Sequence, residues 1–348
     1  MLVAAWRDLQ WRRRRFLIAV SGTALVFAMT LVLAGLSNAF VVEVDRTLHV
    51  VHADRWVVAS GATSPFNSSQ VVPGAALGRV RKARGVVAAD PFIALHNTIG
   101  VDDPTNVTTI GAVPGGVGSP TVTDGRAPRR DGEVAVSSRL DASIGDRVVI
   151  GGRRYTVVGI VPKSSLYGGT ANVFLTLHAV QSSTFNGLDL ATAIAVRGHA
   201  FRAPPGVTAV TNARARTDLL SALGAGRQTI DVVAVLLWIV AACIIGSIVY
   251  LSALERVRDF AVFKATGTST PALMLGLAFQ AVVISLLAAL AGAVIATLMA
   301  PQFPIPAEIP PSAYVVLPIV AIVVGFLASL AGLRRAVTVS PALAFGGA

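Results

Sequence analysis

The chain has 348 residues, of which 54% are hydrophobic and only 14% are charged, whereas soluble domains typically carry about 25% charged residues. This composition excludes an ordinary soluble domain. The formal net charge is +11, but the long hydrophilic segment has no dense basic run and few aromatic residues, so the charge does not predict nucleic acid as a partner.

The N-terminal segment, residues 1–15, alternates apolar side chains with Arg and Asp, which predicts an amphipathic helix at a cytoplasmic membrane surface. The uncharged run that follows predicts a first membrane-spanning helix at residues 16–40, because roughly 20 apolar residues cross a bilayer as a helix. This run is too long for the apolar core of a secretory signal, and three more such runs come later. We therefore expect a membrane helix rather than a cleaved signal.

The later uncharged runs predict three further membrane-spanning helices, at residues 232–254, 272–299 and 314–333. None of the four predicted spans contains Asp, Glu, Lys, Arg or His. Ion-coupled transporters place ionisable groups at membrane depth, so their absence from the spans argues against ion-coupled transport. Small residues such as Ala288, Gly292 and Ala296 predict close helix packing. Four spans are few for a transport pathway, so we expect a dimer.

The positive charges near the span ends predict an orientation. Lys and Arg occur in residues 1–15, in the loop 255–271 and in the tail 334–348, whereas the loop 300–313 has none. Short loops that carry an excess of Lys and Arg stay in the cytoplasm. Both termini are therefore predicted to be cytoplasmic, and residues 41–231 to lie outside.

Residues 41–231 predict an α+β domain. β-branched runs punctuated by Gly predict strands at Glu133–Val136, Arg147–Ile150 and Tyr155–Val161. A hairpin turn is expected at Gly151 and Gly152. The flanks, residues 44–58 and 213–231, predict helical stalks that continue the adjoining spans. The predicted fold class is an α-helical membrane protein with four transmembrane helices and an α+β extracytoplasmic domain inserted between helices 1 and 2.

The sequence does not predict an enzyme or a cofactor. It contains no nucleophile elbow, no zinc-protease motif, no C-x-x-C and no phosphate-binding loop. His49, His52 and Asp54 have a spacing that could bind a metal, but no third His or Cys is near, and a solvated helix face is the favoured interpretation. Asn67 and Asn106 begin glycosylation triplets of a kind that is frequent by chance.

If the chain moves a substrate uphill, the energy must enter through a partner, because the sequence has neither a nucleotide site nor ionisable residues in its spans. The best candidate for the segment that contacts this partner is the loop 255–271. On a helix, Phe260, Phe263 and Lys264 would fall on one side, so that two aromatic rings could fill a groove of the partner. A loop whose only role was to set the orientation of the helices in the membrane would need the positive charges but not the aromatic residues.

The same loop carries a family resemblance. Residues 256–267 read R-V-R-D-F-A-V-F-K-A-T-G, which closely resembles the R-x-R-E-I-G-x-x-[KR]-A-x-G signature of the MacB/FtsX-like permeases of ABC transporters, a family that includes the LolC/LolE proteins. The resemblance extends to the basic segment 6–15, to the Gly-rich pattern 125–160 and to the tail 334–343. Two departures occur within the signature: Asp259 stands where Glu is usual, and Ala261 stands where Gly is usual.

The resemblance implies a permease subunit in the bacterial plasma (inner) membrane, whose coupling helix docks into a cytoplasmic ABC ATPase. In that family the loop performs the coupling, which assigns ATPase coupling here to Arg256, Arg258, Asp259, Phe260, Phe263, Lys264 and Gly267. It further implies a homodimer or heterodimer of permeases with two ATPase subunits, in which nucleotide-driven movement passes through the stalks to the external domain. MacB carries a fused ATPase domain; here we expect the ATPase to be a separate polypeptide.

Two functions are compatible with this resemblance. The first is export or extrusion of a hydrophobic or envelope-associated substrate, with membrane lipid and an extracytoplasmic adaptor or substrate protein as candidate partners. The second is an FtsX-like regulator whose external domain activates a cell-wall hydrolase without transport. An importer subunit is a weaker alternative, because importer permeases usually have more spans and no large outer domain.

Overall fold

The computed structural model describes residues 13–66, 70–100, 104–255, 262, 267, 269–303 and 307–337. The chain divides into two compact units, which we call the membrane unit (residues 1–39 and 226–348) and the inserted domain (residues 40–225). Most of the predicted N-terminal amphipathic helix, up to residue 12, lies outside the described residues.

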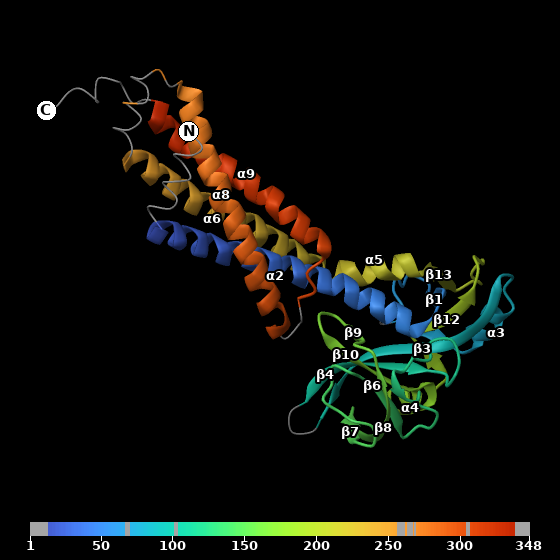
Figure 1. Ribbon diagram of the computed structural model, residues 1–348. Helices are drawn as coiled ribbons and strands as arrows, with labels where there is room; N and C mark the ends of the chain where they lie inside the picture. Colours follow the sequence, from blue (N-terminus) through green and yellow to red (C-terminus); the bar gives the residue numbers. More distant parts are fainter. Residues whose placement is uncertain are drawn as a thin grey trace. The chain divides into compact units, whose positions relative to one another are not determined.

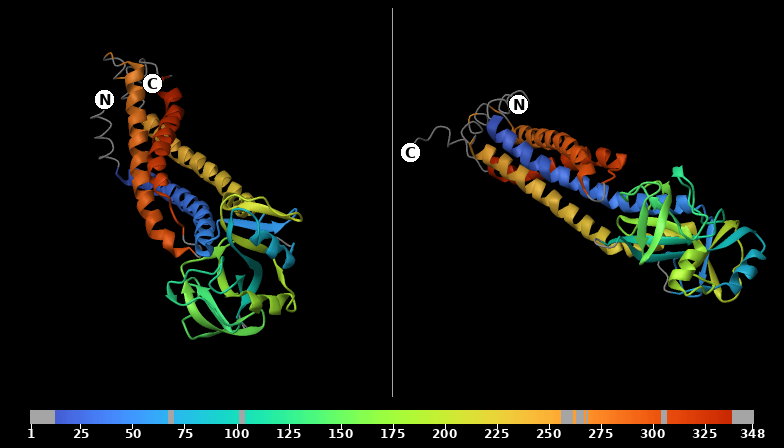
Figure 2. Two further views of the ribbon diagram at one scale, coloured as in Figure 1. Left: turned by 90° about the vertical axis from the view of Figure 1, so that its right-hand side faces the viewer. Right: turned by 90° about the horizontal axis from the view of Figure 1, so that it is seen from below.

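The membrane unit is a bundle of long helices (Figures 1 and 2). Its helices are α2 (Arg13–Val51), α6 (Gly224–Glu255), α8 (Thr270–Met299) and α9 (Pro311–Val337), with a short 3-10 helix, η1 (Ala300–Gln302), after α8. Each of the four long helices is long and apolar enough to cross a membrane. The four predicted membrane helices are therefore confirmed. Helix α2 is shared: its residues up to Ala39 belong to the membrane unit, and those from Phe40 belong to the inserted domain.

Small residues bring the helices of the bundle close together. A Cβ atom at Gly292 of α8 would lie 2.8 Å from the carbonyl oxygen of Ala24 on α2, and one at Gly325 of α9 would lie 3.0 Å from that of Ala281 on α8. These distances leave no room for a side chain, which is why glycine occupies both positions. The small-residue spacing on α8 thus marks a packed face, since Ala288 and Ala296 are also fully buried.

The inserted domain is built on one mixed sheet of 11 strands. Its strands are β1 (Arg55–Ala59), β3 (Val86–Ile99), β4 (Thr105–Ala112), β5 (Asp124–Gly125), β6 (Glu133–Ser137), β7 (Arg147–Ile150), β8 (Arg153–Val161), β9 (Ser165–Leu166), β10 (Thr170–Thr176), β12 (Ala193–Gly198) and β13 (Val207–Thr211). A separate pair consists of β2 (Val72–Pro73) and β11 (Leu190–Ala191), and the domain's helices are α3 (Ala75–Arg81), α4 (Leu177–Thr184) and α5 (Asn212–Ala222).

The sheet is open at one end and curls on itself at the other. Its order is β13-β1-β12-β3-β4-β10-β6-β8-β5, with the pairs β4–β10 and β6–β8 parallel. Strand β7 pairs with β8 and also meets β3 where Ile150 lies opposite Ile99. This contact closes β3, β4, β10, β6, β8 and β7 into a ring (Figure 1), which buries Ile93, Val134, Val157 and Val173 together.

The open part of the sheet has its own core. Trp56, Phe66 and Phe92 form a cluster of three edge-to-face rings, with centroids 4.9 to 5.6 Å apart. Leu48 of α2 and Leu219 of α5 belong to the same apolar cluster. The segment of α2 beyond the membrane unit is therefore part of the core of the inserted domain, not a helix that merely leads to it.

The predicted hairpin is confirmed, and one predicted stalk is partly wrong. Strands β7 and β8 are antiparallel, and Gly151 and Gly152 connect them with φ values of +55° and +81°, as a two-residue primed turn requires. The helix predicted over residues 44–58 ends at Val51, and residues 55–59 form β1 instead. The reason is tertiary: β1 lies between β12 and β13, where its β-branched residues are buried.

The second predicted stalk, residues 213–231, is helical but interrupted. Helix α5 ends at Ala222, and α6 begins at Gly224, with Leu223 between them as the C-cap of α5.

Candidate functional site

The predicted ATPase-coupling loop connects the end of α6 at Glu255 to the start of α8 at Thr270. Of the seven residues assigned to coupling, Arg256, Arg258, Asp259, Phe260, Phe263 and Lys264 lie outside the described residues. Gly267 is described: its φ is +91°, and no atom lies within 4 Å of the place where a Cβ would be. This backbone conformation favours glycine. The role of the seven residues in coupling stays a prediction.

The helices on either side of this loop are held together inside the bundle. The side-chain amide of Gln280 on α8 donates a hydrogen bond to the hydroxyl of Ser252 on α6, at 3.5 Å, and both side chains are buried. Ser252 lies less than one turn before the end of α6. Gln280 lies ten residues after the start of α8, so the contact joins the last turn of α6 to the interior of α8 rather than to its first turn.

A buried carboxylate attaches α2 to the sheet of the inserted domain. Glu43 of α2 is 3% exposed, and its two oxygens accept hydrogen bonds from the backbone N–H groups of Gly168 (3.2 Å) and Gly169 (2.8 Å). Both glycines, in the loop between β9 and β10, have positive φ, +81° and +103°, so that successive N–H groups converge on one anion. We call Glu43, Gly168 and Gly169 the Glu43 latch.

A second polar contact lies one turn further along α2. The hydroxyl of Thr47 donates to the carbonyl oxygen of Ser165 at 2.8 Å. The amide of Asn172 donates to the hydroxyls of Ser164 (2.7 Å) and Thr47 (3.2 Å), and these side chains are fully buried. Two successive turns of α2 are therefore bonded to the β9–β10 hairpin and to the segment that precedes it.

An ion pair joins the two helices that lead toward the membrane spans. The guanidinium of Arg216 on α5 donates to both carboxylate oxygens of Asp45 on α2, at 2.5 and 3.1 Å. The hydrogen bond that Arg216 donates to this carboxylate raises the pKa of Arg216. The neighbouring Asn212 donates to the carbonyl oxygen of Ala53 at 2.5 Å and accepts from the indole N–H of Trp56 at 2.7 Å. Helix α5 is thus bonded to α2 through Asp45, and to the segment that follows α2 through Ala53 and Trp56.

The sequence contained weak signals for these contacts. Glu43 is the first acidic residue after the long uncharged run, and Gly168-Gly169 is a glycine pair followed by a β-branched strand. Nothing in the sequence indicates that they meet, because the latch joins positions 125 and 126 residues apart.

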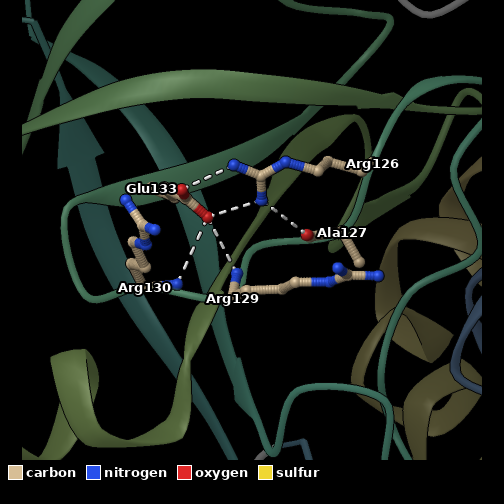
Figure 3. Close-up of polar contacts among 5 residues, drawn as sticks. All are labelled: Arg126, Ala127, Arg129, Arg130 and Glu133. Atoms are coloured by element: carbon tan, nitrogen blue, oxygen red, sulfur yellow. Dashed lines mark hydrogen bonds and ion pairs between the residues drawn. The ribbon is translucent and has the colours of Figure 1, made fainter.

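A second carboxylate organises an arginine-rich loop elsewhere in the domain (Figure 3). Glu133 at the start of β6 accepts two hydrogen bonds from the guanidinium of Arg126, at 2.6 and 2.7 Å. It also accepts from the backbone N–H groups of Arg129 (2.9 Å) and Arg130 (3.2 Å). Together these donors, the Arg126 side chain first, lower the pKa of Glu133 from 4.5 to about 2, although burial opposes the shift.

We predict that this carboxylate makes the stability of the inserted domain acid-sensitive. The folded-state pKa of Glu133 lies below its value in the unfolded chain, so its contribution is fully present above about pH 4.5 and is lost as the pH falls toward 2. The melting temperature of Glu133→Gln should therefore be lower than that of the wild type at pH 7, and the difference should shrink toward pH 3. The variant Asp141→Asn removes an exposed carboxylate and should keep the wild-type pH profile. A constant difference between pH 7 and pH 3 would contradict the assignment.

The histidines singled out in the sequence lie at the end of α2. His52 has a φ of +51°, and its Nε2 lies 2.5 Å from the hydroxyl of Thr121. In the part of the chain that the structure describes, no three His, Cys, Asp or Glu side chains are placed to hold a metal ion. Of the two glycosylation triplets, the one at Asn67 lies outside the described residues, and Asn106 is exposed on β4.

Two family models match the chain. The model described as FtsX-like permease C-terminal matches residues 232–341, and the model described as MacB-like periplasmic core domain matches residues 16–218. The first match covers α6, α8 and α9 with their loops, and the second covers α2 with most of the inserted domain.

Relatives match over the whole chain. An uncharacterized ABC transporter permease of Mycobacterium tuberculosis is 49% identical over 348 residues, which is 100% of both chains. A protein of Staphylococcus haemolyticus that bears the name hemin transport system permease protein HrtB is 21% identical over 286 residues, 79% of each chain. The solved periplasmic region of MacB from Actinobacillus actinomycetemcomitans is 11% identical, with a TM-score of 0.35 over 50% of this chain and 96% of that chain.

Proposed function

Because the chain belongs to the FtsX-like ABC transporter permeases with a MacB-like periplasmic core domain, we propose that it couples ATP hydrolysis by its ATPase partner to movement of the inserted domain. An ABC transporter permease works with such a partner, and the energy for this chain's work would come from it. In this proposal, the movement of the inserted domain serves to export or extrude a substrate.

The observation that carries this proposal is the continuity of α2. One uninterrupted helix contributes residues up to Ala39 to the membrane unit and residues from Phe40 to the inserted domain. Within the inserted domain, this helix is held by the Glu43 latch, by Thr47 and by the ion pair of Asp45 with Arg216. A displacement of the part of α2 that lies in the inserted domain would therefore act on the sheet and on α5 through short polar contacts.

The cytoplasmic end of the coupling is the loop between α6 and α8. We propose that Phe260 and Phe263 fill a groove of the ATPase, and that Arg256, Arg258, Asp259 and Lys264 supply charged contacts around them, with Gly267 allowing the turn toward α8. The buried contact of Gln280 with Ser252 supports this role, because a docked loop can transmit force only if the helices that bear it keep their spacing.

A permease dimer with two ATPase subunits completes the proposed assembly. In the most apolar stretch of α6 only 22% of the residues are buried, compared with 50% in the most apolar stretch of α2. A shallow apolar groove of about 620 Å³ runs beside it, lined by Ile239, Gly246 and Tyr250 of α6 and by Leu327 of α9. Such a face can accept a helix of a second permease subunit.

The proposal is tested by isolating the ATPase and measuring its rate. The tagged full-length chain should co-purify an ABC ATPase from membranes of its host, and this ATPase should hydrolyse ATP several times faster in nanodiscs with the chain than alone. Recovery of the chain without any ATPase, or an ATPase rate that the chain leaves unchanged, would contradict the proposed coupling.

The proposed orientation places both termini and the loop 255–271 in the cytoplasm and the inserted domain outside. Cys243 is the only cysteine, so Cys243→Ala gives a cysteine-free background. In that background a membrane-impermeant maleimide applied to intact cells should label Asp141→Cys in the inserted domain but not Val262→Cys in the loop; both positions are exposed. Permeabilised cells should label both. The reverse pattern would overturn the orientation.

A further inference from the structure

Two adjoining grooves on the inserted domain lie where the end of α2, the start of α5 and the end of β12 meet. The first has a volume of about 580 Å³ and is lined by residues that include Asp45, His49, Asp54, Arg197 and Arg216. The second has a volume of about 520 Å³ and is lined by Arg55, His199 and others. Asp54 and Arg197 line both, so the two grooves adjoin at these residues, and we call the pair of grooves the Arg197 trough.

The walls of the trough are fixed by hydrogen bonds. Arg216 is bonded to Asp45, and Asn212 is held between Ala53 and Trp56. One carboxylate oxygen of Asp54 accepts from the backbone N–H of Gly198 at 2.9 Å. These contacts pre-organise the part of the wall formed by Asp45, Asp54, Asn212 and Arg216, so a ligand would not have to order these four side chains on binding.

The charges that remain in the trough are mainly positive. Asp45 is neutralised by Arg216, which leaves Asp54 against the guanidinium groups of Arg55 and Arg197. Three of the five histidines of the chain, His49, His52 and His199, also line it. The side chains of Arg55, Arg197, His49 and His199 make no hydrogen bond or ion pair within the described part of the chain. Arginine offers only donors, and its planar fork matches the oxygens of carboxylate and phosphate groups.

We propose that the Arg197 trough is a binding site for a small ligand that bears a carboxylate or a phosphate group, with the guanidinium of Arg197 as its central contact. Among the described residues, Arg197 is the one cation that lines both grooves, so it can reach an anion placed in either of them. The site lies within the inserted domain and needs neither ATP nor a partner subunit, so it is independent of the proposed coupling.

Trp56 provides a reporter for the test. Its indole N–H is bonded to Asn212, which lines the trough, and the chain has only three other tryptophans, Trp6, Trp11 and Trp238. Changing these three to Phe leaves Trp56 as the only tryptophan in the full-length chain. We would titrate this protein, in phosphatidylcholine nanodiscs, with inorganic phosphate and with succinate, and follow the emission of Trp56.

The expected result is a saturable change of emission for at least one of the two anions. In the variant Arg197→Gln, the dissociation constant of that anion should rise about tenfold or more, because the charge-assisted, bidentate hydrogen bonds from the guanidinium are lost. Arg197→Lys keeps the charge but not the fork and should show an intermediate loss. The matched control is Arg154→Gln, which removes an exposed arginine from β8, remote in sequence from the trough, and should bind as the wild type does.

Two results would overturn the proposal. One is the absence of a saturable response to either anion up to about 10 mM, the weak end of specific small-ligand binding. The other is an equal loss of affinity in Arg197→Gln and Arg154→Gln, which would show a general charge effect.

Repeating the titration in phosphatidylglycerol nanodiscs identifies the source of the ligand. Weaker apparent binding there indicates competition by an anionic lipid headgroup, and equal binding indicates a free anion. Either outcome of this phosphatidylglycerol experiment supports the proposed site.

Discussion

Replacing both Phe260 and Phe263 with Asp should abolish the stimulation of the partner ATPase by the permease. If the two rings fill a groove of the ATPase, the change removes the apolar contact and brings two carboxylates into that groove without a partner. Truncation of a central aromatic anchor alone commonly costs more than 2 kcal/mol of binding. The measurement compares ATP hydrolysis by the co-purified or reconstituted complex with hydrolysis by the ATPase alone.

The loop itself supplies the matched control for this experiment. Val262 lies between the two phenylalanines in sequence and is 51% exposed. On a helix it would point away from the side that carries Phe260 and Phe263. Val262→Asp should therefore leave the ATPase rate close to that of the wild type, and all variants should be inserted in the membrane in equal amounts. Full stimulation by the double variant would refute the assignment of the coupling loop.

Replacing Glu43 with Ala should destabilise the inserted domain strongly. The change leaves the N–H groups of Gly168 and Gly169 without their acceptor in a partly buried place, and a hydrogen bond to a charged group contributes about 1.5–3 kcal/mol. We expect the free energy of unfolding to fall by about 2–5 kcal/mol, and the melting temperature of the inserted domain with it. Thermal unfolding of the full-length chain in detergent, followed by near-ultraviolet circular dichroism, measures the effect.

Two further variants separate the latch from a general effect of charge. Glu43→Gln keeps one acceptor oxygen and should lose about half as much stability. Asp141→Asn removes an exposed carboxylate of the same domain and should leave the melting temperature unchanged. If Glu43→Ala melted like the wild type, α2 would not depend on the latch, and the transmission proposed above would have to pass through Thr47 and Asp45 alone.

The latch also connects stability to function. In the proposed mechanism α2 delivers movement to the sheet, so Glu43→Ala should weaken the link between ATP hydrolysis and movement of the inserted domain even where the domain remains folded. The side chain of Glu43 is buried, and both of its carboxylate oxygens accept hydrogen bonds. Such an attachment is directional, whereas apolar packing alone would let the helix slide against the sheet.

The sequence by itself determined the four membrane helices, the β7–β8 hairpin and the family. Each of these depends on a local pattern: an uncharged run long enough for a bilayer, a glycine pair between β-branched runs, and a signature in residues 256–267. The prediction of a helical stalk was wrong at residues 55–58, because the structure of this segment depends on strands that are distant in sequence. A local pattern of mixed apolar and charged residues does not reveal that β12 and β13 flank this segment and pair with it.

Only the tertiary structure decided which polar contacts hold α2 and α5 to the rest of the inserted domain. Glu43 meets Gly168 across 125 positions, Asp45 meets Arg216 across 171, and Arg197 shares its trough with residues of α2 and α5. These partners come together because the sheet places β12 beside β1 and β3, and the β9–β10 hairpin against α2. Hydrophobic period and turn residues specify which elements form, but the pairing of distant polar groups depends on the packing of those elements, which no local window of the sequence contains.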